Sequence, residues 1–569
     1  MLRTDRVTFQ HLYMDCNSII YDVFRQLEID HPELLVDTQL LEDRIIRATI
    51  DKISEYIELI RPEKTVFIAF DGVAPFAKMD QQRNRRYKGA VLAKMISAVN
   101  NTNPNTNPNT NPNTNPNTNP LHMGWSTSNI TPGTQFMAKL SKRVAKTFQG
   151  METHYKTERI IVTASDECGE GEHKMFQHMR SQTLIRNSSD TVAVYGLDSD
   201  LIMLSIFHCR LYQNIYIFRE TPEFIKSSIS VPEDPDRPFD KNDPKAPKPC
   251  SFMDIRQLSS AILTEMQCGV PDTQRIFDYV FLCFFLGNDF LPHFPSLNIR
   301  TTGIDTLMDT YRRLIGCTAD RFFISRDMRI QWQWVSLFIK ELAKNEHGHI
   351  LAEYDLRSKW SKRKWLIGTV EERDNTFNSV PVIYRAEEEY ICPKEREWEG
   401  RYYKALFREH LCPTIPSSQN IHNQNNIRDL SKNVCLNYLE GLEWVFKYYT
   451  MDCPHWRWKY KYHYPPLLVD LCRHIPNKTL DQGQFYEFIK SDALSATPFI
   501  PTVQLAYVLP TSNHGLLPTK VQELLKSKHG ELFPVEFDFQ WAFCRYFWEA
   551  HAQLPEIPLS TMDKWTKAF

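Results

Sequence analysis

Carboxylate side chains recur at short spacing, beside glycine, in the first half of the chain. Glu170 and Glu172 belong to Gly169-Glu-Gly-Glu-His-Lys174, and one serine separates Asp198 from Asp200. Two bare carboxylates about 4 Å apart repel by about 4 kcal/mol at an effective dielectric constant of about 20, so a pocket with several of them requires protonation or a cation. Oxygen ligands select hard cations such as Mg²⁺ or Mn²⁺. Two such ions about 4 Å apart activate a water and stabilise the leaving oxygen of a phosphodiester.

Three further aspartates stand where a run of β-forming or apolar residues ends. Asp15 and Asp71 each end such a run, and Asp289 follows the apolar run at 279–286. A single Asp after a strand is usually a turn residue or a helix N-cap, and that structural interpretation applies to any one of these positions taken alone. Considered together, the candidate catalytic and metal-binding residues are Asp15, Asp71, Glu170, Glu172, Asp198, Asp200 and Asp289.

These side chains need a scaffold that brings distant segments together. Short β-forming runs alternate with helix-like segments, which is typical of an α/β fold with a mostly parallel, doubly wound sheet flanked by helices. Ligands of such sheets bind beyond the carboxyl ends of the strands, so we expect the acids to meet at one sheet edge. The expected strands are 11–15, 65–71, 159–163 and 191–195, and the expected helices are 39–60, 78–99, 136–148 and 171–182.

A basic segment follows Asp71 after a short turn that contains proline. Lys78, Gln82, Arg85 and Arg86 are spaced i, i+4, i+7 and i+8, which places all four on one helix face. Because Arg binds phosphate in a fork geometry, a cationic face near a carboxylate site suits a terminal phosphate. A solvated basic helix has the same spacing; the short link to Asp71 favours the phosphate site.

The second half of the chain is rich in tryptophan and tyrosine and is patterned mainly as helices. We expect one helix over 430–450 and another over 533–551, with a cluster of aromatic and basic residues between them at 456–466. Two tracts are expected to be exposed loops: five copies of Asn-Thr-Asn-Pro at 101–120, and a segment rich in Pro, Asp and Lys at 232–249.

The composition is that of a folded protein with a substantial core, with 42% hydrophobic and 24% charged residues. The formal net charge of −2 neither supports nor excludes a nucleic-acid partner, because a phosphate chain responds to the local potential of a groove. The 13 cysteines are dispersed without a C-x-x-C pair, which favours free thiols in a reducing compartment. No apolar run is long enough to span a bilayer, so we expect an intracellular protein that does not associate with a membrane.

In collinear order, segments over nearly the whole chain resemble the XRN family of 5′→3′ exoribonucleases. In the first half the similarity rests on Leu12–Asn17, Asp71–Pro75, Ala77–Met79, Gln81–Arg83, Ile130–Thr134, Phe136–Met137, Gly169–Lys174, Tyr195–Asp198, Asp200–Leu204, Phe281–Phe285 and Gly287–His293. In the second half it rests on Gly441–Trp444, Tyr448–Tyr449, Trp456–Trp458, Tyr462–Pro466, Leu509–Pro510, Leu516–Pro518 and Phe533–Glu536.

The resemblance implies a processive enzyme that hydrolyses single-stranded RNA from a 5′-monophosphate end, uses two Mg²⁺ or Mn²⁺ ions, releases mononucleotides and serves RNA degradation such as mRNA decay. It assigns all seven acids to metal binding. Each cleavage would expose a new 5′-phosphate, whereas a triphosphate or capped end would be too bulky for the pocket. The resemblance assigns that pocket to Lys78, Gln82, Arg85 and Arg86.

Base stacking is the second role that the resemblance suggests. Trp456 and Trp458 are candidates for a contact of about 1 to 3 kcal/mol per base, with burial in a helical core as the alternative. Tyr21 stands where the family has a histidine that stacks on the terminal base. The family's usual segment beginning Gly-Val-Pro has no counterpart before the first strand, and the chain ends soon after the second shared region. We therefore expect a compact form of the enzyme, of a kind suited to a virus or a minimal genome.

The expected regions are a catalytic nuclease region at 1–316 with an insertion at 101–120, a variable connection at 317–430 and a second conserved, mainly helical region at 431–569. Two other functions remain open. A structure-specific 5′ flap endonuclease of the same superfamily would release longer fragments, and an inactive RNA-binding scaffold would be expected to lack one of the seven acids. Without a basic localisation run, we expect a cytoplasmic rather than a nuclear protein.

Overall fold

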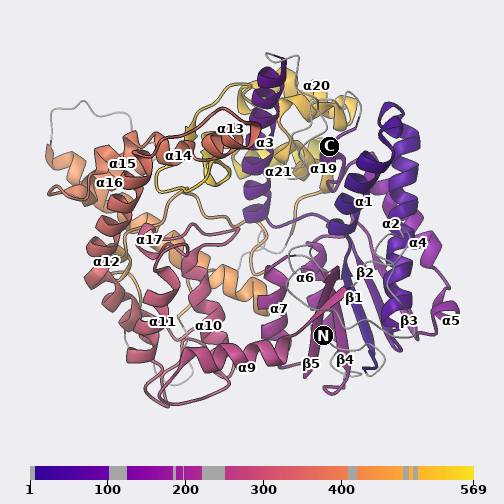
Figure 1. Ribbon diagram of the computed structural model, residues 1–569, viewed down its shortest axis with the longest axis horizontal. Helices are drawn as coiled ribbons and strands as arrows, with labels where there is room; N and C mark the ends of the chain where they lie inside the picture. The colour runs from indigo at the N-terminus through magenta and orange to yellow at the C-terminus, as the bar shows by residue number, and fades with distance from the viewer. Residues whose placement is uncertain are drawn as a thin grey trace. The chain divides into compact units, whose positions relative to one another are not determined.

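The computed structural model describes residues 7–101, 125–182, 187–196, 198–220, 250–407, 420–477, 486–490 and 497–569 (Figure 1). The tract of Asn-Thr-Asn-Pro repeats beyond residue 101 and the segment 232–249 lie outside these residues. Contacts divide the chain into two compact units, one of Met1–Val73 with Met123–Ala261 and one of Ala74–His122 with Ile262–Phe569. The division into three regions along the sequence stays a prediction.

A six-stranded sheet forms the centre of the first unit, with strand order β3-β2-β1-β4-β5-β6. The first five strands are parallel, and β6 pairs antiparallel with β5. The strand order reverses between β1 and β4, which is the place where sheets of this kind bind ligands. The expected α/β fold is thereby confirmed. The strands are β1 (His11–Asp15), β2 (Thr65–Ala69), β3 (Arg159–Thr163), β4 (Thr191–Tyr195), β5 (Asn214–Glu220) and β6 (Cys250–Asp254).

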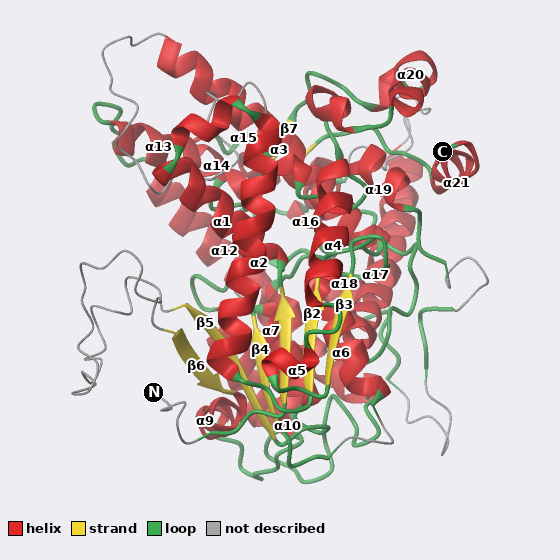
Figure 2. Ribbon diagram, turned by 90° about the vertical axis from the view of Figure 1, so that its right-hand side faces the viewer, coloured by secondary structure: helices red, strands yellow, loops and turns green. Residues whose placement is uncertain are grey.

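Helices cover both faces of this sheet (Figures 1 and 2). Leu12 and Met14 of β1 belong to the main apolar core, whereas Tyr13 between them bonds to His178 on the other face. Successive strand residues point to opposite faces, so burial on both sides explains why the strands are continuous apolar runs. The helices of this unit are α1 (Asn17–Asp30), α2 (Thr38–Ile60), α4 (Gln135–Phe148), α5 (Glu152–Tyr155), α6 (Gly171–Ser181) and α7 (Asp200–His208), while α9 (Ile255–Met266) crosses the boundary between the units.

The second unit is mainly helical, as expected. Its two short strands, β7 (Phe539–Gln540) and β8 (His551–Ala552), pair antiparallel. No helix within the described ranges is long and apolar enough to cross a membrane. The helices are α3 (Phe76–Asn101), α10 (Arg275–Cys283), α11 (Gly303–Leu314), α12 (Trp332–Ser361), α13 (Val370–Asn378), α14 (Val380–Ile383), α15 (Ala386–Ile391), α16 (Trp398–Leu406), α17 (Asn420–Thr450), α18 (Leu468–Leu471), α19 (Pro501–Val508), α20 (Thr519–Lys528) and α21 (Leu559–Ala568).

One expectation from the sequence is wrong. The segment 533–551 is not a helix: it contains β7 and the start of β8, separated by turns and a 3-10 helix at Phe547–Glu549. Aromatic residues at 537, 539, 541 and 543 recur every second position, which is the period of a strand. The apolar run at 279–286, to which no element was assigned from the sequence, forms the end of α10 and a 3-10 helix at Phe284–Leu286. A short apolar run does not distinguish a buried strand from a buried helix.

Candidate active site

Asp15 and Asp71 lie at the carboxyl ends of the neighbouring strands β1 and β2, and Asn17 connects them. The backbone N–H of Asn17 donates to Asp15 Oδ1 at 3.4 Å, and its side-chain amide donates to Asp71 Oδ2 at 2.6 Å. In return, Asn17 Oδ1 accepts the backbone N–H of Asp71 at 3.1 Å. Asn17 therefore fixes the position of Asp71 relative to Asp15. This role of Asn17 was not predicted from the sequence, in which the residue stands out only as part of a motif.

The first residue of α6 approaches both carboxylates closely. The backbone N–H of Gly171 donates to Asp71 Oδ1 at 2.7 Å. A Cβ atom at Gly171 would lie 2.6 Å from Asp15 Oδ1 and 3.5 Å from Asp71 Oδ1. Glycine is required here because any side chain would collide with Asp15. A helix N-terminus also favours negative charge, so α6 supports the two carboxylates electrostatically.

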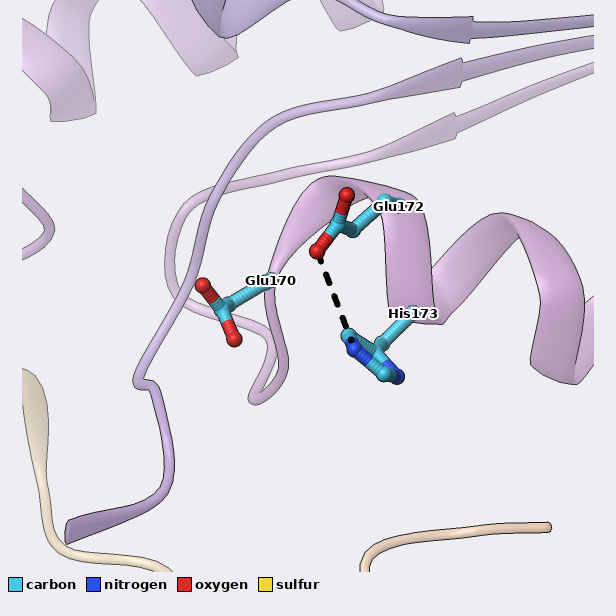
Figure 3. A group of neighbouring side chains, drawn as sticks. All are labelled: Glu170, Glu172 and His173. Carbon is cyan, nitrogen blue, oxygen red and sulfur yellow. Dashed lines mark ion pairs between the residues drawn. The ribbon is translucent and has the colours of Figure 1, made fainter. Parts of the chain in front are cut away.

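A second acidic group lies at the same helix start. Glu170, Glu172 and His173 are buried, with 5%, 7% and 8% of their surface exposed. One ligand atom of each lies within 4.8 Å of those of the other two, so these residues could hold a metal ion (Figure 3). His173 Nε2 lies 3.7 Å from Glu172 Oε1. His173 was not among the ligands predicted from the sequence, although its place beside the paired glutamates was the available signal.

Asp198 and Asp200 follow β4, the neighbour of β1 on the other side. The backbone N–H of Asp200, the first residue of α7, donates to Asp198 Oδ1 at 3.2 Å. Asp198 is exposed and Asp200 is partly buried. The first unit thus contains six of the seven acids predicted from the sequence.

The pKa of Asp15 shows that these acids interact. Burial raises it well above its ordinary value, and the charges of Asp71, Asp198 and Glu170 raise it further, against the opposing effect of the Asn17 N–H. The sheet edge therefore concentrates negative charge on oxygen atoms around a buried carboxylate. This donor set fits a hard divalent cation, because such a cation would relieve the repulsion.

Lys174 supports the site from within. Its Nζ donates to the carbonyl oxygens of Phe70 at 2.9 Å and Ala164 at 2.8 Å, which ties together the segments that follow β2 and β3. Burial lowers its pKa, against the charges of nearby carboxylates that include Asp71. Gly72 is needed in the same place, because a Cβ atom there would lie 1.6 Å from the carbonyl oxygen of Glu167. The sequence analysis missed the positioning role of Lys174.

The seventh acid, Asp289, belongs to the second unit and does not follow a strand. Its role as a metal ligand stays a prediction. Asp289 Oδ2 accepts a hydrogen bond from Lys78 Nζ at 2.8 Å, and Oδ1 accepts one from Gln81 Nε2 at 3.3 Å. Burial opposes ionisation of Asp289, but the charge and hydrogen bond of Lys78 hold its pKa below the ordinary value.

The four residues of the predicted phosphate pocket all lie on α3. Lys78, Gln82 and Arg86 are partly buried and Arg85 is exposed. The Oε1 atom of Gln82 is buried and has no hydrogen-bond partner within the described residues. The expected helix is thus present, and it presents polar groups that a ligand could bind.

The three candidates for base stacking differ in exposure. Tyr21 on α1 and Trp456 are partly buried. Trp458 is 8% exposed, its ring stacks on Trp444 at 5.3 Å between centroids, and its indole N–H donates to Glu440 at 3.2 Å. For Trp458 the structure supports the alternative of a buried core residue.

Comparison with known proteins adds evidence independent of this geometry. Residues 2–221 match the family model described as XRN 5′-3′ exonuclease N-terminus, and residues 271–387 and 384–563 match the one described as Xrn1 helical domain. The chain is similar to the 5′-3′ exoribonuclease 2 of Debaryomyces hansenii (26% identity over 96% of this chain and 64% of that protein) and of Arabidopsis thaliana (24%, 96% and 61%). It is also similar to the 5′-3′ exoribonuclease 2 homolog of Drosophila melanogaster (26%, 97% and 64%). It spans 61 to 64% of the length of these relatives.

Proposed function

Because this chain belongs to the XRN family of 5′→3′ exonucleases, we propose that it hydrolyses single-stranded RNA from a 5′-monophosphate end and releases mononucleotides. The observation that carries the proposal is the acidic sheet edge, where burial and the charges of Asp71, Asp198 and Glu170 raise the pKa of the Asp15 carboxyl. A group of buried carboxylates of this kind suits the binding of hard cations and phosphodiester hydrolysis.

We further propose that the carboxylates of the sheet edge hold Mg²⁺ or Mn²⁺ in two positions, and that Asp289 is a further metal-binding residue. Bound there, the ions would supply an activated water and stabilise charge on the leaving oxygen. The residues of the chain have their own tasks. Asn17 and the N–H of Gly171 orient Asp71, and Lys174 holds the backbone that carries it. These hydrogen bonds fix the carboxylate before a ligand arrives.

The helix α3 supports the proposed preference for a 5′-monophosphate. Lys78 already binds one anion, the carboxylate of Asp289, and Gln82 offers a buried polar atom nearby on the same face. Arg85 and Arg86 would add fork-shaped donors that match phosphate oxygens. Rebinding of the new 5′-phosphate after each cleavage would make the enzyme processive.

One experiment separates this proposal from its alternatives. Uniformly labelled single-stranded RNAs with a 5′-monophosphate or a 5′-triphosphate are incubated with the full chain, in Mg²⁺ and in EDTA. We expect mononucleotides from the monophosphate RNA in Mg²⁺ and from no other combination. Longer fragments would indicate a flap endonuclease, intact RNA in every lane would indicate a scaffold, and equal decay of both RNAs would contradict the phosphate pocket.

A further inference from the structure

A group of aromatic and arginine side chains in the second unit takes no part in the proposed site. The rings of Tyr546 and Trp548 are stacked, with 4.1 Å between centroids and 13° between planes. The guanidinium of Arg545 lies 4.7 Å from the Tyr546 ring and 4.9 Å from the Trp360 ring, and that of Arg300 lies 5.4 Å from the Tyr546 ring. We call these five residues the Trp548 stack.

The stack leaves a large aromatic ring in solvent. Trp548 is 53% exposed, and it is the one exposed tryptophan among the 12 of the chain, all of which lie in described segments. Contacts between arginine and tyrosine within the protein account for Arg545 and Tyr546. These contacts do not explain why the Trp548 indole is exposed to solvent. An exposed amphipathic ring of this kind is suited to binding a ligand.

The surroundings of the stack are positively charged. Lys88, Arg300 and Arg545 all interact with the carboxylate of Glu549, which forms an ion pair with Arg300. Burial lowers the pKa of Lys88 to about 8, so its side chain still carries charge at neutral pH, and its Nζ donates to the Trp548 carbonyl oxygen. The Arg545 guanidinium bonds to the Ser379 hydroxyl at 3.4 Å and has no ion pair in the portion of the chain described.

The stack also adjoins the helix that carries the proposed phosphate pocket. Lys88 follows Arg85 on α3 by three residues, which places the two side chains about 5 to 6 Å apart at their Cβ atoms. Asn84 on the same helix accepts the backbone N–H of Ala552 at 2.9 Å, just beyond the stack. A basic side chain of α3, that of Lys88, therefore reaches the backbone of Trp548.

We propose that the Trp548 stack binds single-stranded RNA by stacking a base on the Trp548 indole while Arg300 and Arg545 attract the adjacent phosphates. An exposed aromatic face combined with arginines is the chemistry that holds single strands without reading their sequence. A flexible, unpaired strand fits this surface, because a base in a duplex has both faces covered by its neighbours. The choice of RNA as the ligand rests on the proposed function, whereas the binding surface itself does not.

The test measures binding without decay. Short single-stranded RNA with a 5′-hydroxyl end, which the proposed pocket does not select, is titrated with the full chain in Mg²⁺ by fluorescence anisotropy, and a gel checks that the RNA stays intact. We expect Trp548→Ala to weaken binding about tenfold and Trp548→Phe to retain most of the affinity. The control is Tyr390→Ala on α15, because Tyr390 is 52% exposed and is not part of the Trp548 stack. This control should bind RNA like the unchanged protein.

Two further measurements make the outcome decisive. RNA with abasic positions throughout should bind the unchanged protein and Trp548→Ala equally, because no base is left to stack. Trp548→Leu keeps an apolar side chain and should therefore fold. Its affinity for RNA should nevertheless be weaker than that of the unchanged protein. Affinity of Trp548→Ala and Trp548→Leu equal to that of the unchanged protein would overturn the inference even if RNA decay is confirmed. Trp548-dependent binding, together with no decay of 5′-monophosphate RNA in Mg²⁺, would instead support it and contradict the proposed enzymatic function.

Discussion

The Nζ atom of Lys78 lies 2.8 Å from Oδ2 of Asp289, so the first residue of the basic face of α3 is already bound to an acid. A 5′-phosphate that reaches Lys78 would have to share or replace this contact. The pair therefore links the residue proposed to select the RNA end with an acid proposed to serve catalysis.

Lys78→Gln should impair the use of 5′-monophosphate RNA. Removing the charge leaves a hydrogen-bonding group of similar length but weakens the attraction for a dianionic phosphate, so we expect KM to rise about tenfold or more. Affinity for 5′-hydroxyl RNA should not change. Lys359→Gln, at an exposed lysine of the same unit, serves as the control. An equal loss for both kinds of RNA end would argue against a phosphate contact.

Asp198→Ala should abolish RNA decay while RNA binding and folding persist. Asp198 is exposed and its carboxylate accepts the backbone N–H of Asp200, so its removal leaves no unpaired charge in the core. Loss of one ligand of a catalytic metal is expected to reduce kcat by about 10³-fold or more. Decay is followed with 5′-monophosphate RNA in Mg²⁺, with the exposed Glu158→Ala as the control. Full activity of Asp198→Ala would contradict the metal assignment.

Gly171→Ala should weaken metal binding more than it affects folding. Its Cβ atom would lie 2.6 Å from Asp15 Oδ1, so either the carboxylate or the start of α6 must move. The increase in Tm on adding Mn²⁺ measures this without activity, and we expect it to shrink or disappear. Gly348→Ala on α12 is the matched control, because nothing lies within 4 Å of its Cβ position. That control should keep the full shift and gain about 1 kcal/mol in the free energy of unfolding.

The stability of the first unit should fall as the pH drops below about 6.5. Burial lowers the pKa of His178 to about 4 and of His208 to about 3, with nearby arginines adding to the effect. At a pH below 6.5, the ordinary pKa of histidine, both side chains bind a proton in the unfolded chain but remain neutral in the folded protein. Two such protons correspond to about 2.7 kcal/mol per pH unit near pH 5. Urea unfolding at pH 7 and pH 5 measures the loss.

His208→Gln should remove about half of that contribution, and the matched change at the exposed His154 should remove none. His208 is buried between the Leu204 carbonyl and the guanidinium of Arg180, whereas His154 meets water in both the folded and the unfolded chain. An identical pH dependence for His208→Gln and the unchanged protein would show that His208 is protonated in the folded state.

Several features followed from the sequence because their cause is local. The expected strand 11–15 and the helix start at 171 agree with the structure to the residue, since apolar runs and the glycine-flanked acids mark them directly. The helical spacing of Lys78, Gln82, Arg85 and Arg86 needed only the period of a helix. All seven acids were expected at the sheet edge from the rule that ligands bind beyond strand ends, and six of them lie in the unit that contains the sheet.

Other features depend on partners that are distant in the chain. Asn17 acquires its role because Asp71, 54 residues away, lies beside it, and Lys174 because two strand ends converge on its amine. Trp458 becomes a core residue through Trp444 and Glu440 on α17. The run at 279–286 is helical although its composition suits a strand equally well.

The sequence by itself therefore determined the periodic elements, the chemistry of the acids and the family. Tertiary structure alone decided which polar groups meet, which aromatic rings are buried, and where a glycine cannot be replaced. The physical reason is that helical and strand periods are set by the backbone within a few residues, whereas burial and hydrogen bonding are set by whichever distant segments pack together.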